Sequence, residues 1–120
     1  MADDKLPSKV DFGTESYNIR SKRIEVRGEV DHATAPALRL KIQEAIASKA
    51  QIIILNLSGV TRMDSAAVAV LIEGIQWARK ERIILSLQDV SPAAQSVLEV
   101  ARVDKLFQVS GNNYLPPQKK

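Results

Sequence analysis

The residues best suited to chemistry are Asp64 and Ser65, a carboxylate and a hydroxyl at the predicted start of a helix. They follow a predicted apolar strand and a polar loop. Free backbone N–H groups and the positive end of the helix dipole favour an anion at such a position. Phosphorylation of Ser65 would add about −1.5 to −2 charges, enough to switch a docking surface. The alternative is that Ser65 or Asp64 serves only as the N-cap of the helix.

Other kinds of chemistry are excluded by what the sequence lacks. The chain has no cysteine, which removes thiol catalysis, cysteine-based zinc sites and disulfides. Its five glycines match neither G-x-G-x-x-G nor G-x-x-x-x-G-K-[ST], which excludes nucleotide binding through those motifs. The single histidine, His32, cannot form a multi-histidine metal site and is expected to be an exposed loop residue. We therefore predict no catalytic residue, no cofactor and no metal, and we do not expect an enzyme.

The composition is that of one globular domain. The chain has 120 residues, 45% of them hydrophobic and 26% charged, with a formal net charge of +3. Both signs of charge are interleaved and aromatic residues make up only 4%, so we predict no nucleic-acid partner. The N-terminus is polar and the apolar runs are short, which predicts no signal peptide, no membrane insertion and a cytoplasmic location.

Hydrophobic periodicity predicts an α/β chain with the element order β-β-α-β-α-β-α-β. Alternating apolar and polar residues predict strands at 17–20 and 24–27. A helix over 35–48, with Thr34 as its N-cap, follows them. The run at 52–57 is short, apolar and rich in isoleucine, which predicts a central strand buried on both faces of a parallel sheet.

The second half of the chain continues the alternation of strands and helices. A polar loop is expected at 58–63, followed by a helix at 65–79 and a buried strand at 83–87. A third helix, capped by Ser91, is expected from 92, and a short final strand at 106–109. Right-handed crossovers make this part of the sheet mainly parallel and place the helices together on one side. Asp31 and Asp64 become neighbours if their strand-to-helix junctions share one rim of that sheet.

Four motifs occur together in order and spacing: Gly28-Glu29-Val30-Asp31 before Thr34-Ala35, the run from Ile54 to Val60, Met63-Asp64-Ser65, and the run from Val97 to Phe107. Together they resemble STAS domains, the family of bacterial anti-sigma factor antagonists and of domains attached to sulfate transporters. The similarity covers about residues 16–110, which leaves 1–15 and 111–120 as expected tails. The resemblance implies a mixed sheet of about five strands, with three or four helices mainly on one side.

The resemblance also implies a function and a site. In antagonists of this family, the serine directly after the aspartate of the loop-to-helix motif is phosphorylated by the partner anti-sigma kinase, and that serine is Ser65 here. The unphosphorylated antagonist binds the anti-sigma factor, phosphorylation breaks the complex, and a phosphatase resets it. The implied neighbours of the switch site are Asp31, Asp64 and Asn56. The implied partner-binding residues are Ser65, Ala66, Val68, Ala69 and Glu73.

Two positions depart from the pattern of the family. Ala67 stands where many members have glycine, which is expected to put a methyl group near the docking face. Asn56 stands where aspartate is frequent.

Two further functions fit the same resemblance. STAS subunits of lipid-trafficking ABC transporters bind their ATPase subunit constitutively, and an exposed Trp77 on the docking helix would anchor such an interface. Packing of Trp77 in the core is the alternative. A scaffold component of a larger signalling assembly is the third function. For each of them we expect a monomer or a weak homodimer.

Overall fold

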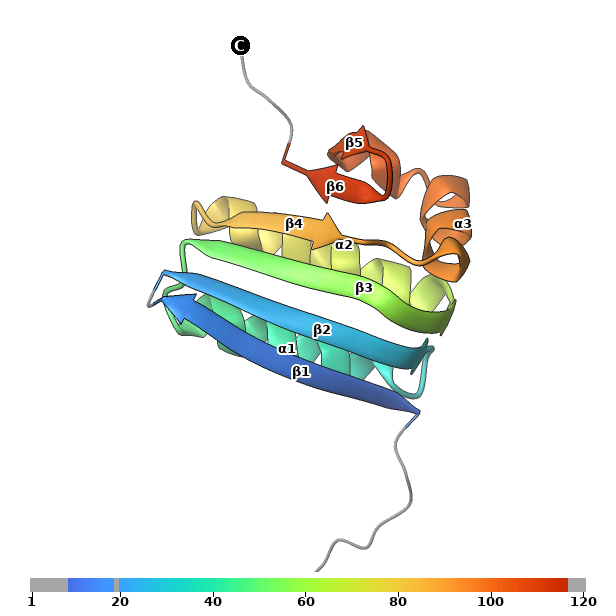
Figure 1. Ribbon diagram of the computed structural model, residues 1–120, viewed down its shortest axis with the longest axis horizontal. Coiled ribbons are helices and arrows are strands. Elements are labelled where there is room, and N and C mark those ends of the chain that lie inside the picture. The colour runs from blue at the N-terminus through green and yellow to red at the C-terminus, as the bar shows by residue number, and fades with distance from the viewer. Residues whose placement is uncertain (1–8, 19, 117–120) are drawn as a thin grey trace, which may run out of the picture.

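The strands of the computed structural model, which describes residues 9–18 and 20–116, form one six-stranded sheet in the order β1-β2-β3-β4-β6-β5 (Figure 1). They are β1 (Val10–Asn18), β2 (Ser21–Val30), β3 (Ile52–Met63), β4 (Ile84–Gln88), β5 (Gln108–Ser110) and β6 (Asn113–Leu115). β2, β3 and β4 run parallel, because helices connect them, whereas β1 and the β5–β6 pair are antiparallel to their neighbours.

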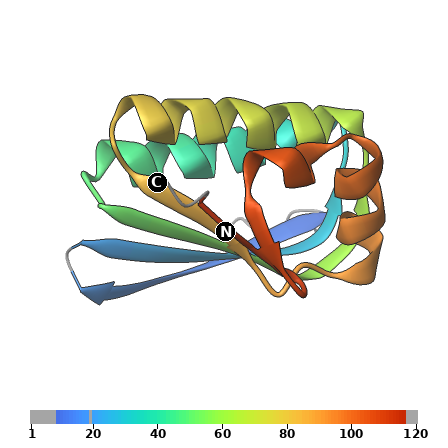
Figure 2. The same cartoon turned by 90° about the horizontal axis from the view of Figure 1, so that it is seen from above.

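The two long helices cover one face of this sheet and leave the other face without a helix (Figure 2). They are α1 (Ala35–Ala47) and α2 (Ser65–Lys80), while α3 (Pro92–Val100) and the short 3₁₀ helix η1 (Val103–Leu106) lie toward the end and edge of the sheet. The core between sheet and helices consists of fully buried aliphatic residues, among them Ile24, Ile53, Leu55, Leu57, Leu38, Ile42 and Leu71. In the part of the chain that the structure describes, no helix combines the length and apolar character needed to cross a membrane.

The predicted α/β class, the mixed sheet and the placement of the helices are confirmed. The limits predicted for the first two helices, 35–48 and 65–79, each agree with the structure to within one residue. Ser91 is the N-cap of α3, as predicted, and its hydroxyl oxygen accepts from the backbone N–H of Ala94 at 3.1 Å. These elements have long or strongly marked sequence patterns, which is why they could be predicted closely.

The sheet extends into both of the segments that the sequence predicts as tails. β1 begins at Val10, inside the expected N-terminal tail, because Val10 is buried and pairs with Gly28 of β2. β6 lies inside the expected C-terminal tail, where Tyr114 is fully buried and packs against the ring of Phe107. Residues 1–8 and 117–120 of the expected tails, and residue 19 of the predicted strand at 17–20, lie outside the described residues.

Two predictions about β3 are wrong. The expected polar loop at 58–63 continues the strand, because β2 extends to Val30 and pairs with it as far as Met63. The strand is also not buried on both faces, since the helices cover only one of them and Ile52 is 37% exposed. The predicted last strand at 106–109 begins later, as β5, because η1 occupies the preceding residues.

Candidate functional site

Ser65 is the first residue of α2, and its side chain is exposed. It follows directly on the end of β3, whose apolar residues Val60 and Met63 are buried and fix the direction in which the chain leaves the sheet. Within the described residues, no group forms a hydrogen bond with the Ser65 hydroxyl. The hydroxyl is therefore presented to solvent from the first turn of α2.

Asp64, and not Ser65, is the N-cap of α2, whereas the sequence allowed either residue. Its Oδ1 accepts hydrogen bonds from the backbone N–H groups of Ala66 at 2.9 Å and Ala67 at 3.3 Å. Its Oδ2 accepts from the backbone N–H of His32 at 3.1 Å, and its own N–H donates to the carbonyl of Val30 at 3.2 Å. One carboxylate thus joins the start of α2 to the turn between β2 and α1.

Asp31 lies in that turn, and its side chain is only 9% exposed. Its Oδ2 accepts from the Lys9 Nζ at 2.6 Å, and its Oδ1 accepts from the backbone N–H groups of Ala33 at 3.0 Å and Thr34 at 3.1 Å. The ammonium group of Lys9, followed by these two N–H groups, holds the pKa of Asp31 well below its usual range. Asp31 therefore stays ionised and serves to fix the turn.

The predicted role of Thr34 is corrected by the same contacts. Thr34 does occupy the N-cap position of α1, but its side chain makes no capping hydrogen bond. Its hydroxyl instead donates to the carbonyl of Glu29 at 2.8 Å and accepts from the N–H of Asp31 at 2.9 Å. At the start of α1, the backbone carbonyl of Asp31 accepts a hydrogen bond from the N–H of Ala35 at 2.7 Å.

The structure brings Asp31 and Asp64 to one turn but leaves Asn56 elsewhere. Asn56 lies seven residues before the end of β3, which places it about 23 Å back along the strand. Its buried amide group bonds to Ser58, Gln88 and Asp89, none of which contacts Asp64. The expectation that Asn56 neighbours the switch site is therefore wrong.

The residues expected to bind a partner divide into surface and core. Ser65 and Ala69 are exposed, and Ala66 and Glu73 are half-buried. Val68 is 6% exposed and belongs to the core, because at its helical position it faces the sheet. It cannot be a direct contact for a partner, which corrects that prediction.

Ala67 is fully buried in the core as well. The methyl group in which this chain departs from the usual glycine therefore points away from the exposed surface of α2. The expected obstruction of the docking face is not present, since the docking face never meets that side chain.

Three surface features near α2 were missed at the level of sequence. Arg39 of α1 donates from Nε to Glu73 Oε1 at 2.9 Å, and the neighbouring Leu40 is 55% exposed. Helical spacing could have found both, because Leu40 lies on the side of α1 opposite its buried residues and Arg39 lies on the flank that meets α2. Lys9 could not be found in this way, since it belongs to the expected tail and is 22 residues away from Asp31.

Trp77 is half-buried and lines a hollow between the two long helices. The hollow also contains Gln43, Ile46 and Ala47 of α1 and Glu81. Trp77 is therefore neither a fully exposed anchor nor a residue of the closed core.

The arrangement offers a hydroxyl to an external reagent and holds little else for chemistry. Among residues 9–18 and 20–116, no group of three or more histidine, cysteine, aspartate or glutamate side chains is placed to hold a metal ion. The carboxylate next to Ser65 is already engaged by three backbone N–H groups. What the site presents to an external reagent is therefore the exposed Ser65 hydroxyl, beside a carboxylate whose oxygens are occupied.

Comparisons with known proteins agree with this geometry. The family model described as Mlab, STAS domain matches residues 16–109. The crystal structure of an anti-sigma factor antagonist from Mycobacterium paratuberculosis superimposes with a TM-score of 0.76 at 24% identity, covering 88% of this chain and 89% of that one. The anti-sigma factor antagonist SpoIIAA in its unphosphorylated form gives 0.68 at 24% identity, over 78% of this chain and 82% of that one. The Bacillus cell fate determinant SpoIIAA in its phosphorylated form gives 0.63 at 24% identity, over 76% and 83%. At these identities the likenesses show a common fold.

Proposed function

The chain belongs to the STAS domain family, and from this premise we propose that it is a regulatory protein of the anti-sigma factor antagonist kind, switched by phosphorylation of Ser65. Its partner would be an anti-sigma factor that is also a serine kinase and holds the ATP. A phosphatase would reset the switch. The protein itself would act as a substrate and a binding surface in the cytoplasm, and not as an enzyme.

The observation that carries this proposal is the division of labour between Asp64 and Ser65. Asp64 caps α2, so the Ser65 hydroxyl is exposed and has no structural task among the described residues. A phosphoryl group can be attached there without removing a hydrogen bond that holds the helix. A serine that capped its own helix would lose that bond on modification.

Phosphorylation would add charge to a side of α2 that carries few charges of its own. Exposed Ala69 follows Ser65 by one helical turn, and the next charged side chain along that side of α2, Glu73, is paired with Arg39. A phosphate would bring about −1.5 to −2 charges to this surface, beside the Asp64 carboxylate. Repulsion between the two anions and the cost of removing water from the phosphate would both weaken docking of a partner. Burial of Ala67 supports the proposal, because the docking face is not altered by that substitution.

A second function stays under test because the description of the matching family model names Mlab. In it, the same face of α2 would bind the ATPase subunit of an ABC transporter constitutively. Trp77 would contribute from the hollow between α1 and α2. This function needs the exposed surface but no modification of Ser65.

Affinity capture of the protein from its own cells, with mass spectrometry of partners and of the Ser65 peptide, tests the proposal. We expect a kinase-type anti-sigma factor and phosphate on Ser65. Recovery of a transporter ATPase with Ser65 unmodified would contradict the switch and favour the second function.

Variants of Ser65 make the test independent of the cellular phosphorylation level. Ser65→Ala should keep the fold and stay locked in the binding state, whereas Ser65→Asp should weaken binding of the captured partner. Ser110→Asp adds the same charge at an exposed position of β5 and serves as the matched control. Equal affinities of Ser65→Ala and Ser65→Asp would argue against the switch.

A further inference from the structure

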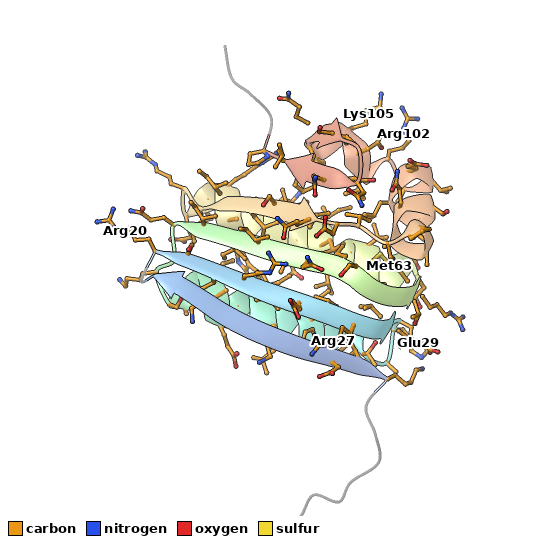
Figure 3. The ribbon with its side chains drawn as sticks, in the orientation of Figure 1. Arg20, Arg27, Glu29, Met63, Arg102 and Lys105 are labelled. Carbon is orange, nitrogen blue, oxygen red and sulfur yellow. The ribbon has the colours of Figure 1, made fainter. Side chains whose placement is uncertain are left out.

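The chain segment before β1 is attached to the same end of the sheet as Ser65. Figure 3 labels Glu29 and Met63 at this end, where β2 and β3 finish, and Arg20 at the opposite end. The carbonyl oxygen of Lys9 accepts a hydrogen bond from the N–H of Glu29 at 2.7 Å. Lys9 thereby fixes the entry of the chain into β1 next to the strand ends.

Gly28 makes this attachment possible. Its φ angle of +99° is one that side chains rarely adopt, and a Cβ at this position would collide with the Lys9 carbonyl oxygen. The backbone of β2 can therefore approach the backbone of Lys9 closely, and this contact depends on glycine at position 28.

The Lys9 side chain continues the contact toward the switch site. Its Nζ lies 2.6 Å from Asp31 Oδ2 and 3.7 Å from Glu29 Oε1. The Lys9 side chain is 51% exposed, whereas that of Asp31 is 9% exposed. Among the side chains of the described residues, Lys9 is the cation that pairs with this nearly buried carboxylate.

Hydrogen bonds at both ends of one backbone turn connect Lys9 to the helix that carries Ser65. The Asp31 carboxylate accepts from the Lys9 ammonium group and from the backbone N–H groups of Ala33 and Thr34. The preceding N–H in the same turn, that of His32, donates to Asp64. Asp64 in turn caps α2 through the N–H groups of Ala66 and Ala67. The bond between Lys9 and the ionised Asp31 belongs to the stronger class of hydrogen bond in proteins.

We propose that Lys9 is a positioning residue for the Ser65 site, acting through Asp31, the β2–α1 turn and Asp64. Lys9 would then be part of the switch, although it precedes residue 16, where the match to the family model begins. A partner that binds Lys9, or a change that neutralises it, would alter the start of α2 without touching it. The effect on phosphorylation rests on the function proposed above, whereas the effect on the turn does not.

Amide hydrogen exchange of the isolated protein, resolved by NMR, tests the structural part. In Lys9→Met we expect exchange at His32, Ala66 and Ala67 to accelerate about threefold, the factor typical of losing a partly exposed ion pair. Lys9→Arg keeps the charge and should restore wild-type rates. Lys105→Met removes an exposed lysine from η1 and is the matched control. Equal rates at these three amides in Lys9→Met and wild type would overturn the proposal.

The rate at which the captured kinase phosphorylates Ser65 tests the functional part. We expect the rate to change about threefold in Lys9→Met, in step with the exchange rates, and to be unchanged in Lys9→Arg and Lys105→Met. Faster exchange with an unaltered phosphorylation rate would overturn the positioning role. If wild-type Ser65 accepts no phosphate, the proposed function fails, while the exchange rates still decide whether Lys9 positions the turn.

Discussion

At the N-terminal end of α2 neighbouring segments are joined by hydrogen bonds to carboxylates, whereas beyond its C-terminal end they are joined by apolar packing. Asp64 and Asp31 accept the backbone N–H groups of the first end. At the other end, side chains of α2, β4, Phe107 and Pro116 line a small, mainly apolar hollow of about 90 Å³. The ring of Phe107 there meets that of Tyr114 edge-on, with 5.7 Å between centroids.

The polar end of α2 is therefore expected to respond to a change of charge, whereas the apolar end contributes mainly to stability. Bonds between ions and backbone N–H groups depend on local charge, so a phosphate at Ser65 acts on the very forces that shape its surroundings. Apolar packing at the other end does not respond to a distant charge. Under the proposed function, the binding surface would change while the core stays intact, and substitutions at the two ends should therefore have different effects.

The largest effect is expected from Tyr114→Ala at the apolar end. Tyr114 is fully buried, and removing its ring would leave a cavity next to Phe107. We expect the free energy of unfolding to fall by about 3–5 kcal/mol, measured by urea denaturation. Binding of a partner by the remaining folded protein should be unchanged. A loss of less than about 1 kcal/mol would contradict the role given to this end.

Tyr114→Phe is the matched control for that experiment. The Tyr114 hydroxyl has no hydrogen-bond partner among the described residues and is buried. Phenylalanine keeps the ring and removes a polar group that is buried without compensation. The free energy of unfolding should therefore stay the same or rise by about 1 kcal/mol.

A smaller loss of stability is expected from Asp64→Ala at the polar end. The substitution removes the cap of α2 and the bond to the N–H of His32. We expect the free energy of unfolding to fall by about 1–2 kcal/mol in the same urea experiment. In contrast to Tyr114→Ala, partner binding should weaken in the protein that remains folded. Asp64→Asn keeps a capping oxygen, and if it lost as much stability as Asp64→Ala, the cap would not be the cause.

The sequence predicts an element well where its hydrophobic pattern extends over several turns. It predicts an element poorly where the strand forms only because a neighbouring strand pairs with it. α1 and α2 have apolar residues at helical spacing over several turns, and their limits are correct to one residue. Residues 10–15 contain only two large apolar side chains, and they form a strand because β2 offers its edge. β6 has only three residues and follows a turn, so its own sequence carries no strand pattern. It is a strand because it pairs with β4 and β5.

The same distinction applies to the candidate site. Ser65 and Asp64 could be placed at a helix start from local sequence, and strand order then brought Asp31 to the same turn. Which of the two residues caps the helix depends on the rotamer and on the neighbouring turn, which periodicity does not contain. Asn56 was misplaced because the predicted strand ended at 57, whereas β3 continues to Met63 and leaves Asn56 far from Ser65. Lys9 was missed because its contact is long-range.

The smallest effect on stability is expected from Ser65→Ala, and it makes the sharpest test of the comparison. The side chain is exposed, Asp64 supplies the cap, and alanine is the better helix former. The free energy of unfolding should therefore stay within about 0.5 kcal/mol of the wild type. Partner binding, measured by calorimetry, should be retained and should no longer respond to treatment with kinase and ATP. A clear loss of stability would mean that the Ser65 hydroxyl helps to hold α2. In that case phosphorylation would act by loosening the helix, and the separation between the responsive end and the stable end would not hold.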